Sequence, residues 1–323
     1  MVPIKVGLLG LGTVGRGTYE VLQRNQHEIA RRAGRGIEVA AITVRDVGKA
    51  RAVVGSKVPI SSDFNDVIRN PDIDIVVELM GGYEPAYSLA LDAIGRGKHV
   101  VTANKALLAR HGNELFDAAR ANGVMLAFEA AVAGGIPIIK ALREGLTGNR
   151  IEWIAGIING TSNFILSEMR SRGISFQAAL SEAQRLGYAE ADPTFDIEGI
   201  DAAHKLAILS SIAFGVPINI DAVYTEGISK LAKEDIKYAE QLGYRIKLLA
   251  ITKRTSAGIE LRVHPTLVPL QRLIANVEGA MNAVLIKGDA VGTTLYYGQG
   301  AGSEPTASAV IADLVDVTRL HTA

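Results

Sequence analysis

The sequence predicts an α/β protein in two parts: a doubly wound parallel sheet, followed by an α+β part whose sheet is largely antiparallel. Over the first 135 residues, apolar strand-like runs alternate with helix-like stretches, which is the pattern of βαβ units. A glycine-rich turn follows the first of these runs. After Gly135 helices dominate and paired apolar runs come near the end, as expected when helices are segregated from an antiparallel sheet.

The elements of the first part follow from runs of apolar and β-branched residues between turn signals. Strands are expected at 4–9, 37–44, 73–80, 99–102 and 125–131. Helices are expected from the glycine-rich turn to about Ala33, and over 62–70, 84–95 and 105–122. The helix from residue 62 should stop at Asn70, because Pro71 follows it.

The second part should begin with a helix over 136–146 and a strand over 151–158, and helices should fill most of 162–215. Antiparallel strands are expected at 245–252, 259–265, 281–287 and 293–297. We expect a last helix over 303–320, capped by Ser303, with Glu304 and Pro305 in its first turn.

Composition and charge exclude several classes of protein. The 323 residues include 34 basic and 34 acidic side chains, so no basic excess is available to bind a nucleic acid. Cysteine is absent, which excludes disulfides, cysteine-bound zinc and thiolate nucleophiles. No apolar run reaches the ~18 residues that span a bilayer, and the sequence starts directly in a strand without a signal segment. We therefore expect a cytoplasmic protein with a small-molecule partner, and neither a nucleic acid nor a membrane.

The turn after the first strand reads G-L-G-T-V-G, from Gly10 to Gly15. Between a strand and a helix, this spacing is typical of a Rossmann-type dinucleotide site. Gly10 permits a tight turn, Gly12 lets the backbone approach a diphosphate, and Gly15 lets the helix pack on the strand. The diphosphate would lie at the helix N-terminus, at Thr13 and Val14. The alternative is a glycine-rich turn without a ligand.

The end of the second strand indicates which dinucleotide binds. An acidic side chain there would accept hydrogen bonds from the ribose of NAD(H), whereas an arginine would pair with the 2′-phosphate of NADP(H). The sequence offers both, as Arg45 and Asp46. If Val44 ends the strand, Arg45 is the first exposed side chain there. We expect NADP(H) to be preferred, with NAD(H) as the alternative.

A run of carboxylates leads up to a lysine in the second part. Asp201 and Lys205 lie four residues apart at the start of a helix, so they share a face. One interpretation is an ordinary surface ion pair. However, residues 206–209 are apolar and predict a buried helix. A lysine directly before this apolar run and beside carboxylates suits proton transfer. The pattern alone leaves both interpretations open.

Five ordered motifs resemble the homoserine dehydrogenase family. The segment from Ala183 to Lys205 matches the family signature through Gly187, Asp192-Pro193, Asp196, Gly199 and Asp201. The other motifs, in the same order as in the family, are T-A-N-K-A (102–106), E-A-A-V-A-G-G-I-P (129–137), N-G-T-S-N (159–163) and G-x-G-A-G (298–302). The resemblance covers essentially the whole chain.

This resemblance implies an activity and a set of site residues. The family reduces L-aspartate 4-semialdehyde to L-homoserine with NADPH or NADH, on the route to threonine, methionine and isoleucine. Lys205 would be the acid/base residue with Asp201 beside it, and Lys105 would reach the reacting centre, the substrate and the cofactor. The residues implied to hold the amino-acid substrate are Tyr188, Glu190, Asp196, Gly160 and Thr161. Gly300, in the second glycine-rich turn, is also expected at the cofactor.

The resemblance further implies a monovalent cation, sodium or potassium. Its ligands would be main-chain oxygens of Glu129, Val132, Gly134 and Ile136. The nucleotide-binding domain would comprise 1–135 plus 303–323, and 136–302 would form the substrate-binding, catalytic and dimerisation domain of a homodimer. Many members continue into an ACT-type regulatory domain. This sequence ends before it, as a short form or a truncated chain, so inhibition by threonine is not carried over.

Two other functions compete with this one. Another two-domain NAD(P) oxidoreductase could act on a sugar or a 2-oxo acid, although the Tyr-x-x-x-Lys pattern of short-chain dehydrogenases is absent from the sequence. A Rossmann-type protein could instead sense NAD(P) without turnover, but it would not need a proton donor such as Lys205 beside Asp201.

Overall fold

The computed structural model describes residues 2–321, which form two compact units. Unit 1 combines the residues up to Gly135 with those from Ala301 onward, and unit 2 comprises Ile136–Gly300. The C-terminal helix therefore belongs to the same unit as the N-terminal strands. Within residues 2–321, no helix is long and apolar enough to cross a membrane.

Unit 1 contains a six-stranded sheet in the order β3-β2-β1-β4-β5-β6. Its strands are β1 (Ile4–Leu9), β2 (Ile37–Thr43), β3 (Ile60–Ser61), β4 (Ile75–Glu78), β5 (His99–Thr102) and β6 (Leu126–Ala127). All of the pairings are parallel. The predicted doubly wound sheet is confirmed, and its strand order reverses between β1 and β4. In such sheets ligands bind outside the carboxyl ends of the strands at this reversal.

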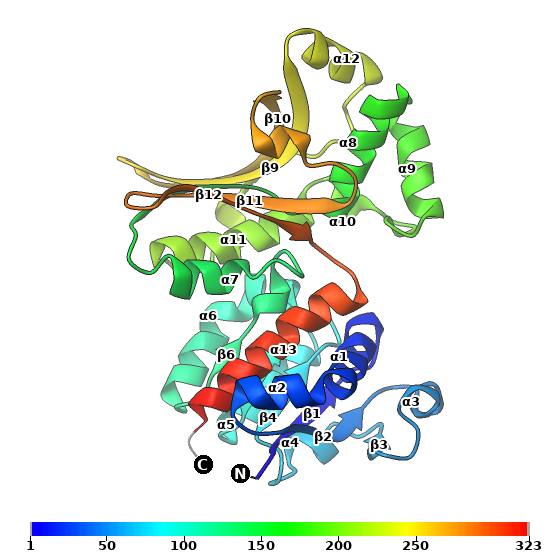
Figure 1. Ribbon diagram of the computed structural model, residues 1–323, viewed down its shortest axis with the longest axis vertical. Helices are drawn as coiled ribbons and strands as arrows, with labels where there is room; N and C mark the ends of the chain where they lie inside the picture. Colours follow the sequence, from blue (N-terminus) through cyan, green and yellow to red (C-terminus); the bar gives the residue numbers. More distant parts are fainter. Residues whose placement is uncertain (1, 322–323) are drawn as a thin grey trace. The chain divides into compact units, whose positions relative to one another are not determined.

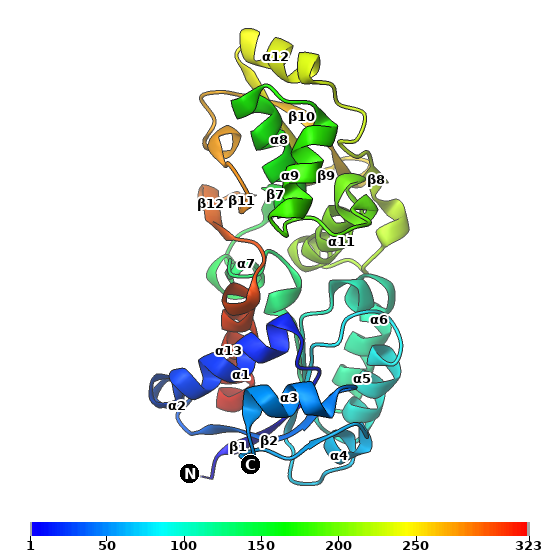
Figure 2. The same cartoon turned by 90° about the vertical axis from the view of Figure 1, so that its right-hand side faces the viewer.

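Helices cover both faces of this sheet (Figures 1 and 2). They are α1 (Thr13–Arg24), α2 (Gln26–Ala33) and α13 (Ser303–Leu320) on one face, with α4 (Asn65–Ile68), α5 (Ala86–Gly95) and α6 (Lys105–Ala121) on the other. On the first face, Leu22 and Val310 pack in one core with Leu8. On the second, Leu107 packs in another core with Val76. Burial on both faces explains why the strands are almost continuously apolar.

Three expectations for unit 1 are wrong, and β2, β4 and α4 are also shorter than predicted. The helix predicted to reach Ala33 is broken at Asn25, which ends α1 and precedes α2. The strand predicted to reach Ala131 stops at Ala127, and the 3₁₀ turn η1 (Glu129–Ala131) follows. There the Glu129 N–H donates to the Asp313 carboxylate at 2.7 Å instead of extending the ladder. Ser303 does not cap α13: its Oγ donates to the Thr13 carbonyl at 2.8 Å, and Gly302 occupies the cap position.

Unit 2 contains a second six-stranded sheet in the order β12-β11-β7-β9-β10-β8. Its strands are β7 (Ile151–Ile157), β8 (Tyr224–Thr225), β9 (Tyr244–Thr255), β10 (Gly258–Pro269), β11 (Met281–Gly288) and β12 (Gly292–Gln299). All pairings are antiparallel except β8 with β10. The largely antiparallel sheet of the prediction is therefore confirmed, and β9 and β10 are longer than predicted.

The helices of unit 2 are mostly those expected. They are α7 (Ile138–Lys140), α8 (Gly160–Arg172), α9 (Phe176–Arg185), α10 (Thr194–Ile197), α11 (Ile200–Phe214) and α12 (Lys233–Gln241). The helix expected over 136–146 is instead the short α7 followed by a π-helical turn, η2 (Ala141–Gly145). The sequence did not predict α12, nor α3 (Val47–Val54) of unit 1. Residues 201–210 of α11 are all buried, and they include the apolar run 206–209 that predicted a buried helix.

Candidate active site

The glycine-rich turn of unit 1 has the geometry of a phosphate-binding turn. Gly10 has φ +100°, and a Cβ there would lie 3.0 Å from the Leu79 carbonyl oxygen. A Cβ on Gly15 would lie 2.4 Å from the Gly10 carbonyl oxygen, so only glycine lets α1 pack this closely. The space around Gly12 is open, and Gly12 provides no side-chain cap for α1. The first N–H groups of α1 therefore remain available to an anion, and these residues fit a dinucleotide diphosphate.

Arg45 and Asp46, the two side chains that could select the cofactor, follow the end of β2 and have different hydrogen-bonding roles. The strand ends at Thr43, one residue earlier than expected. Asp46 is the N-cap of α3, and its Oδ1 accepts a hydrogen bond from the Lys49 N–H at 2.9 Å. Arg45 is exposed in the same loop. Both side chains are therefore exposed, and one oxygen of the Asp46 carboxylate is already used by the helix cap.

Lys205 and Asp201 form a buried ion pair on α11. Lys205 Nζ lies 2.6 Å from Asp201 Oδ2 and also donates to the Ile158 carbonyl oxygen at 2.7 Å. Lys205 is 9% exposed and Asp201 is 3% exposed. The interpretation as a surface ion pair is therefore wrong. Taking two charges out of water is costly, so stability alone is a poor reason for this arrangement.

Asn159 connects this ion pair to a second carboxylate. Its Nδ2 donates to Asp201 Oδ2 at 2.8 Å and to Asp196 Oδ1 at 2.7 Å. Its Oδ1 accepts from the Ser162 N–H at 2.8 Å and caps α8. Burial raises the pKa of Asp196 above its ordinary value against the hydrogen bond from Asn159, and the Asp201 charge adds to the increase. Sequence reasoning did not select Asn159, although it lies in the N-G-T-S-N motif at a strand-to-helix junction.

The other predicted substrate-binding residues lie around the start of α8. Thr161 Oγ1 donates to the Tyr188 carbonyl oxygen at 2.6 Å. A Cβ on Gly160 would lie 2.8 Å from the Ala280 carbonyl oxygen, so this position accepts only glycine without rearrangement. Tyr188 is 47% exposed. Glu190 is exposed too. Unit 2 thus brings Gly160, Thr161, Tyr188 and Asp196 together, with Glu190 in the adjoining loop.

Lys105 is the first residue of α6 in unit 1. Asn104 caps this helix, because its Oδ1 accepts from the Leu107 N–H at 3.1 Å. The Asn104 N–H in turn donates to Thr102 Oγ1 at 3.0 Å. The backbone that carries Lys105 is therefore fixed by side chains of the T-A-N-K segment.

The predicted cation ligands lie in a turn with unusual backbone angles. Ala133 and Gly134 have φ values of +56° and +45°. The Glu129 carbonyl accepts from the Val132 N–H at 3.5 Å, and the Ile136 carbonyl accepts from the Ile138 N–H at 2.7 Å. In the described part of the chain, no three His, Cys, Asp or Glu side chains form a metal-binding group. A cation here would therefore depend on carbonyl oxygens.

Packing within unit 2 explains why position 300 is a glycine. A Cβ on Gly300 would lie 1.8 Å from Asn282 Nδ2. Only glycine therefore fits against Asn282 at the end of unit 2, whether or not a cofactor lies near.

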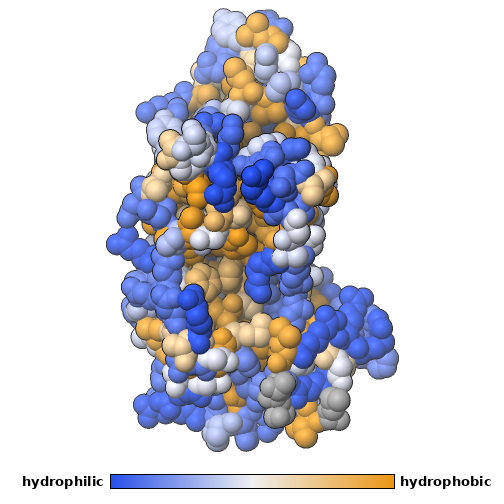
Figure 3. Space-filling view, turned by 90° about the vertical axis from the view of Figure 1, so that its left-hand side faces the viewer, coloured by the Kyte–Doolittle hydropathy of each residue, from blue (hydrophilic) through white to orange (hydrophobic). Residues whose placement is uncertain are grey.

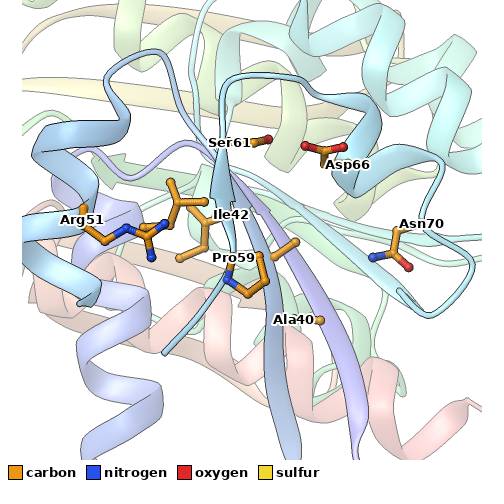
Figure 4. Close-up of a pocket in the computed structure, with 9 residues that line it drawn as sticks. Ala40, Ile42, Arg51, Pro59, Ser61, Asp66 and Asn70 are labelled. Carbon is orange, nitrogen blue, oxygen red and sulfur yellow. The ribbon is translucent and has the colours of Figure 1, made fainter. Parts of the chain in front are cut away.

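A cavity of about 520 Å³ lies at the β2–β3 edge of unit 1 (Figure 4). It is lined by Ala40, Ala41, Ile42, Arg51, Pro59, Ile60, Ser61, Asp66 and Asn70. Arg51 is turned to the backbone, since its Nη1 donates to the carbonyl oxygens of Gly55 and Val58 at 2.9 and 3.1 Å. None of the predicted site residues lines this cavity.

Comparison with known proteins assigns the chain to a family. Residues 137–315 match the model of homoserine dehydrogenase, and residues 10–129 match the NAD-binding domain of homoserine dehydrogenase. The chain belongs to the homoserine dehydrogenase family. A homoserine dehydrogenase of Pseudomonas aeruginosa is 67% identical over 322 residues, which are 100% of this chain and 74% of that protein.

Solved homoserine dehydrogenases have the same fold. The structure from Thiobacillus denitrificans has a TM-score of 0.98 and 71% sequence identity, and the match covers 99% of this chain and 74% of that one. A hyperthermophilic archaeal homoserine dehydrogenase in complex with NADPH has a TM-score of 0.84 and 27% identity, with 99% of both chains covered.

Family membership confirms the predicted activity. The chain is an NAD(P)-dependent oxidoreductase acting on a CH–OH group, and it interconverts L-aspartate 4-semialdehyde and L-homoserine. An oxidoreductase for sugars or 2-oxo acids, and an NAD(P) sensor without turnover, are no longer competing explanations. Homoserine dehydrogenase activity also places the chain in amino-acid biosynthesis.

Proposed function

We propose that Lys205 is the proton donor of this homoserine dehydrogenase and that Asp201 holds it in place. When bound, the reduced cofactor supplies the hydride that adds to the aldehyde carbon. The carbonyl oxygen then gains negative charge and needs a proton. The Lys205 ammonium stabilises that charge and donates the proton. The observation that supports this role best is the buried 2.6 Å pair between Lys205 Nζ and Asp201 Oδ2.

Three groups would orient the ammonium. Asp201 Oδ2 and the Ile158 carbonyl oxygen accept hydrogen bonds from Nζ. Asn159 donates to the same Oδ2 and so restrains the carboxylate. In this proposal the carboxylate orients and balances the cation but does not transfer the proton itself.

We place the amino-acid end of the substrate at the start of α8. Asp196 and Glu190 provide negative charge for the α-ammonium group, and the N-terminus of α8 at Gly160 and Thr161 favours the α-carboxylate. Tyr188 would cover the exposed side of the site. This arrangement would favour an aldehyde that carries both charges over a simple aldehyde.

The cofactor would bind to unit 1 as a dinucleotide-binding domain. The N–H groups at Thr13, Val14 and Gly15 would hold its diphosphate, and Arg45 would pair with the 2′-phosphate of NADP(H). Lys105 would approach the reacting end of the cofactor, and Gly300 would contribute backbone. We propose NADP(H) as the preferred cofactor because Asp46 already caps α3. NAD(H) remains the weaker alternative.

The proposal includes a monovalent cation, a homodimer and a cytoplasmic location. Sodium or potassium would bind the carbonyl oxygens of Glu129, Val132, Gly134 and Ile136, on a turn with two successive positive φ values.

Figure 3 shows apolar side chains gathered into patches on one face of the molecule. In unit 2, Leu267, Leu273 and Tyr297 are 54%, 71% and 58% exposed, which supports a partner subunit at unit 2. The biosynthetic role supports the cytoplasm.

An aldehyde panel tests this function. NADPH oxidation is followed with L-aspartate 4-semialdehyde and with aldehydes that lack the α-ammonium or the α-carboxylate. We expect rapid oxidation only with the semialdehyde, and a fall in kcat of about 10²–10⁴-fold in Lys205→Ala. Lys237→Ala, an exposed lysine on α12, is the matched control. An equal loss of activity in both variants would contradict the role of Lys205.

A further inference from the structure

Glu78 is a fully buried carboxylate at the last position of β4. Its exposed fraction is 0%. Oε1 accepts hydrogen bonds from the N–H groups of Met80 and Gly81 at 2.8 and 3.3 Å, and Oε2 accepts from Thr102 Oγ1 at 2.7 Å. All three donors are neutral, and within residues 2–321 Glu78 forms no ion pair with a lysine, arginine or histidine. A buried charge without a countercharge is costly.

The position of Glu78 indicates where a countercharge could come from. β4 is next to β1, at the point where the strand order reverses, and Glu78 lies at the carboxyl end of the strand. In such sheets the glycine-rich turn after β1 binds the diphosphate, and the half of the sheet that begins with β4 binds the second of the two nucleotides. For NAD(P) that nucleotide carries the nicotinamide. This step rests on the proposed cofactor site.

Hydrogen bonds hold the carboxylate at this edge. Thr102 Oγ1 accepts from the Asn104 N–H at 3.0 Å, and Asn104 Nδ2 donates to the Gly82 carbonyl oxygen at 2.7 Å. Gly81 and Gly82 both have φ +74°, so this loop is a tight turn that favours glycine. Glu78 therefore cannot turn toward a cation of its own chain without breaking this network.

We propose that Glu78 provides a fixed negative charge that favours the oxidised form of the nicotinamide cofactor. The ring is positively charged in NAD(P)⁺ and neutral in NAD(P)H, so a carboxylate near it binds the two forms unequally. The same charge stabilises the positive charge that develops on the ring as the hydride leaves. Glu78 would thus assist reduction of the aldehyde without touching the substrate.

Substitution by glutamine tests this directly, since Glu78→Gln removes the charge and keeps the size. Dissociation constants of NADP⁺ and NADPH are measured by calorimetry in the wild type and the variant. We expect NADP⁺ to bind about tenfold more weakly, or ~1.4 kcal/mol, with at most about a twofold change for NADPH. Glu38→Gln, which removes an exposed carboxylate of β2, is the charge-matched control and should change neither constant.

Two further variants separate charge from structure. Thr102→Val removes one hydrogen bond and no charge, so it should alter the affinities for both forms equally. Glu78→Asp keeps the charge but moves it away from the cofactor by one methylene length. The ratio of the affinities for NADP⁺ and NADPH should therefore shift in the same direction as in Glu78→Gln, but less. If the glutamine variant does not fold, the aspartate variant provides the test. An unchanged ratio of the NADP⁺ and NADPH dissociation constants in the Glu78 variants would overturn the role of Glu78 but not the proposed cofactor site. A wild-type protein that binds neither form would overturn the proposed cofactor site as well.

Discussion

Lys205 Nζ and Asp201 Oδ2 lie 2.6 Å apart, one helical turn from each other on α11, and both side chains are buried. The same carboxylate oxygen accepts a hydrogen bond from Asn159 at 2.8 Å. Asn159 comes from the junction of β7 and α8, so the position of the lysine depends on two segments about 40 residues apart in the chain. Lys205, Asp201 and the turn at the start of α8 are therefore expected to act as one unit in the proposed mechanism.

Coupling between Lys205 and Asp201 is the first prediction. Asp201→Asn keeps the shape but loses the charge that holds the ammonium, so kcat should fall about 10–10²-fold. In the double variant with Lys205→Ala, the loss should be smaller than the product of the two single losses, because the second change removes a partner that is already without function. Asp221→Asn, an exposed site in unit 2, is the control. Fully multiplicative losses would show that the two residues act independently.

Cofactor choice is the second prediction. Arg45→Ala should raise the KM for NADPH much more than that for NADH, since loss of a charged pair with the 2′-phosphate is expected to cost ~1.5–3 kcal/mol. Steady-state kinetics with both cofactors measure this. Arg69→Ala, another exposed arginine of unit 1, should leave both constants unchanged. An equal rise in both KM values for Arg45→Ala would remove the basis for NADP(H) preference.

The third prediction concerns the cation. If the 129–136 turn binds sodium or potassium, either ion should raise the Tm with a saturable concentration dependence, because it binds only the folded state. Tetramethylammonium chloride at equal ionic strength is the control, since it is too large for a carbonyl site. The same Tm in all three salts would mean that the turn is held by protein hydrogen bonds alone.

A half-buried pair of histidines predicts that the stability of the protein depends on pH. His99 Nδ1 accepts from the Met125 N–H at 2.9 Å, and its Nε2 lies 3.0 Å from His321 Nδ1. Burial lowers the pKa of His99, the His321 charge acts the same way, and Asp74 opposes them. As the pH falls, His99 therefore takes up a proton in the unfolded chain before it does so in the folded protein. The contribution of neutral His99 to the free energy of unfolding is complete above about pH 6.5 and declines below that pH.

His99→Gln should remove this decline, since the amide does not titrate. Urea unfolding at about pH 5.5 and about pH 7.5, on either side of the ordinary histidine pKa, measures the difference in the free energy of unfolding. His27→Gln, at an exposed position of α2, should keep the wild-type difference. If His99→Gln keeps it too, the pH dependence comes from other groups.

The fold was predictable wherever a local pattern determines it. The alternation of unit 1 and the apolar run after Lys205 indicated the parallel sheet and the buried helix α11. Two of the errors occur where distant residues decide. Ser303 would be a good cap by its local sequence, but its hydroxyl bonds to the Thr13 carbonyl, and the strand before Glu129 ends where its N–H meets Asp313. Neither contact has a signal in the local sequence.

The motifs indicated which residues to consider for the site and the pairing of Asp201 with Lys205, but not the link from this pair to Asp196. Sequence reasoning selected Lys205 and Asp201 as a pair on one helix face, and Asp196 separately. It missed Asn159, which joins two of them, because an asparagine before a helix is more often only a cap. Glu78 was missed for a different reason: it ends an apolar strand and looks like an ordinary boundary residue. Only its burial and its three neutral donors mark it as unusual.

The most direct test of the central claim compares the two lysines in a single turnover. Hydride transfer from NADPH and from its 4-deuterated form is followed in Lys205→Ala and in Lys105→Ala, with enzyme in excess over cofactor. We predict that Lys205→Ala slows the chemical step by about 10²–10⁴-fold and exposes a full deuterium isotope effect, while NADPH affinity stays close to that of the wild type. Lys105→Ala should retain a faster chemical step. Near-normal chemistry in Lys205→Ala together with its loss in Lys105→Ala would contradict the account and make Lys105 the proton donor.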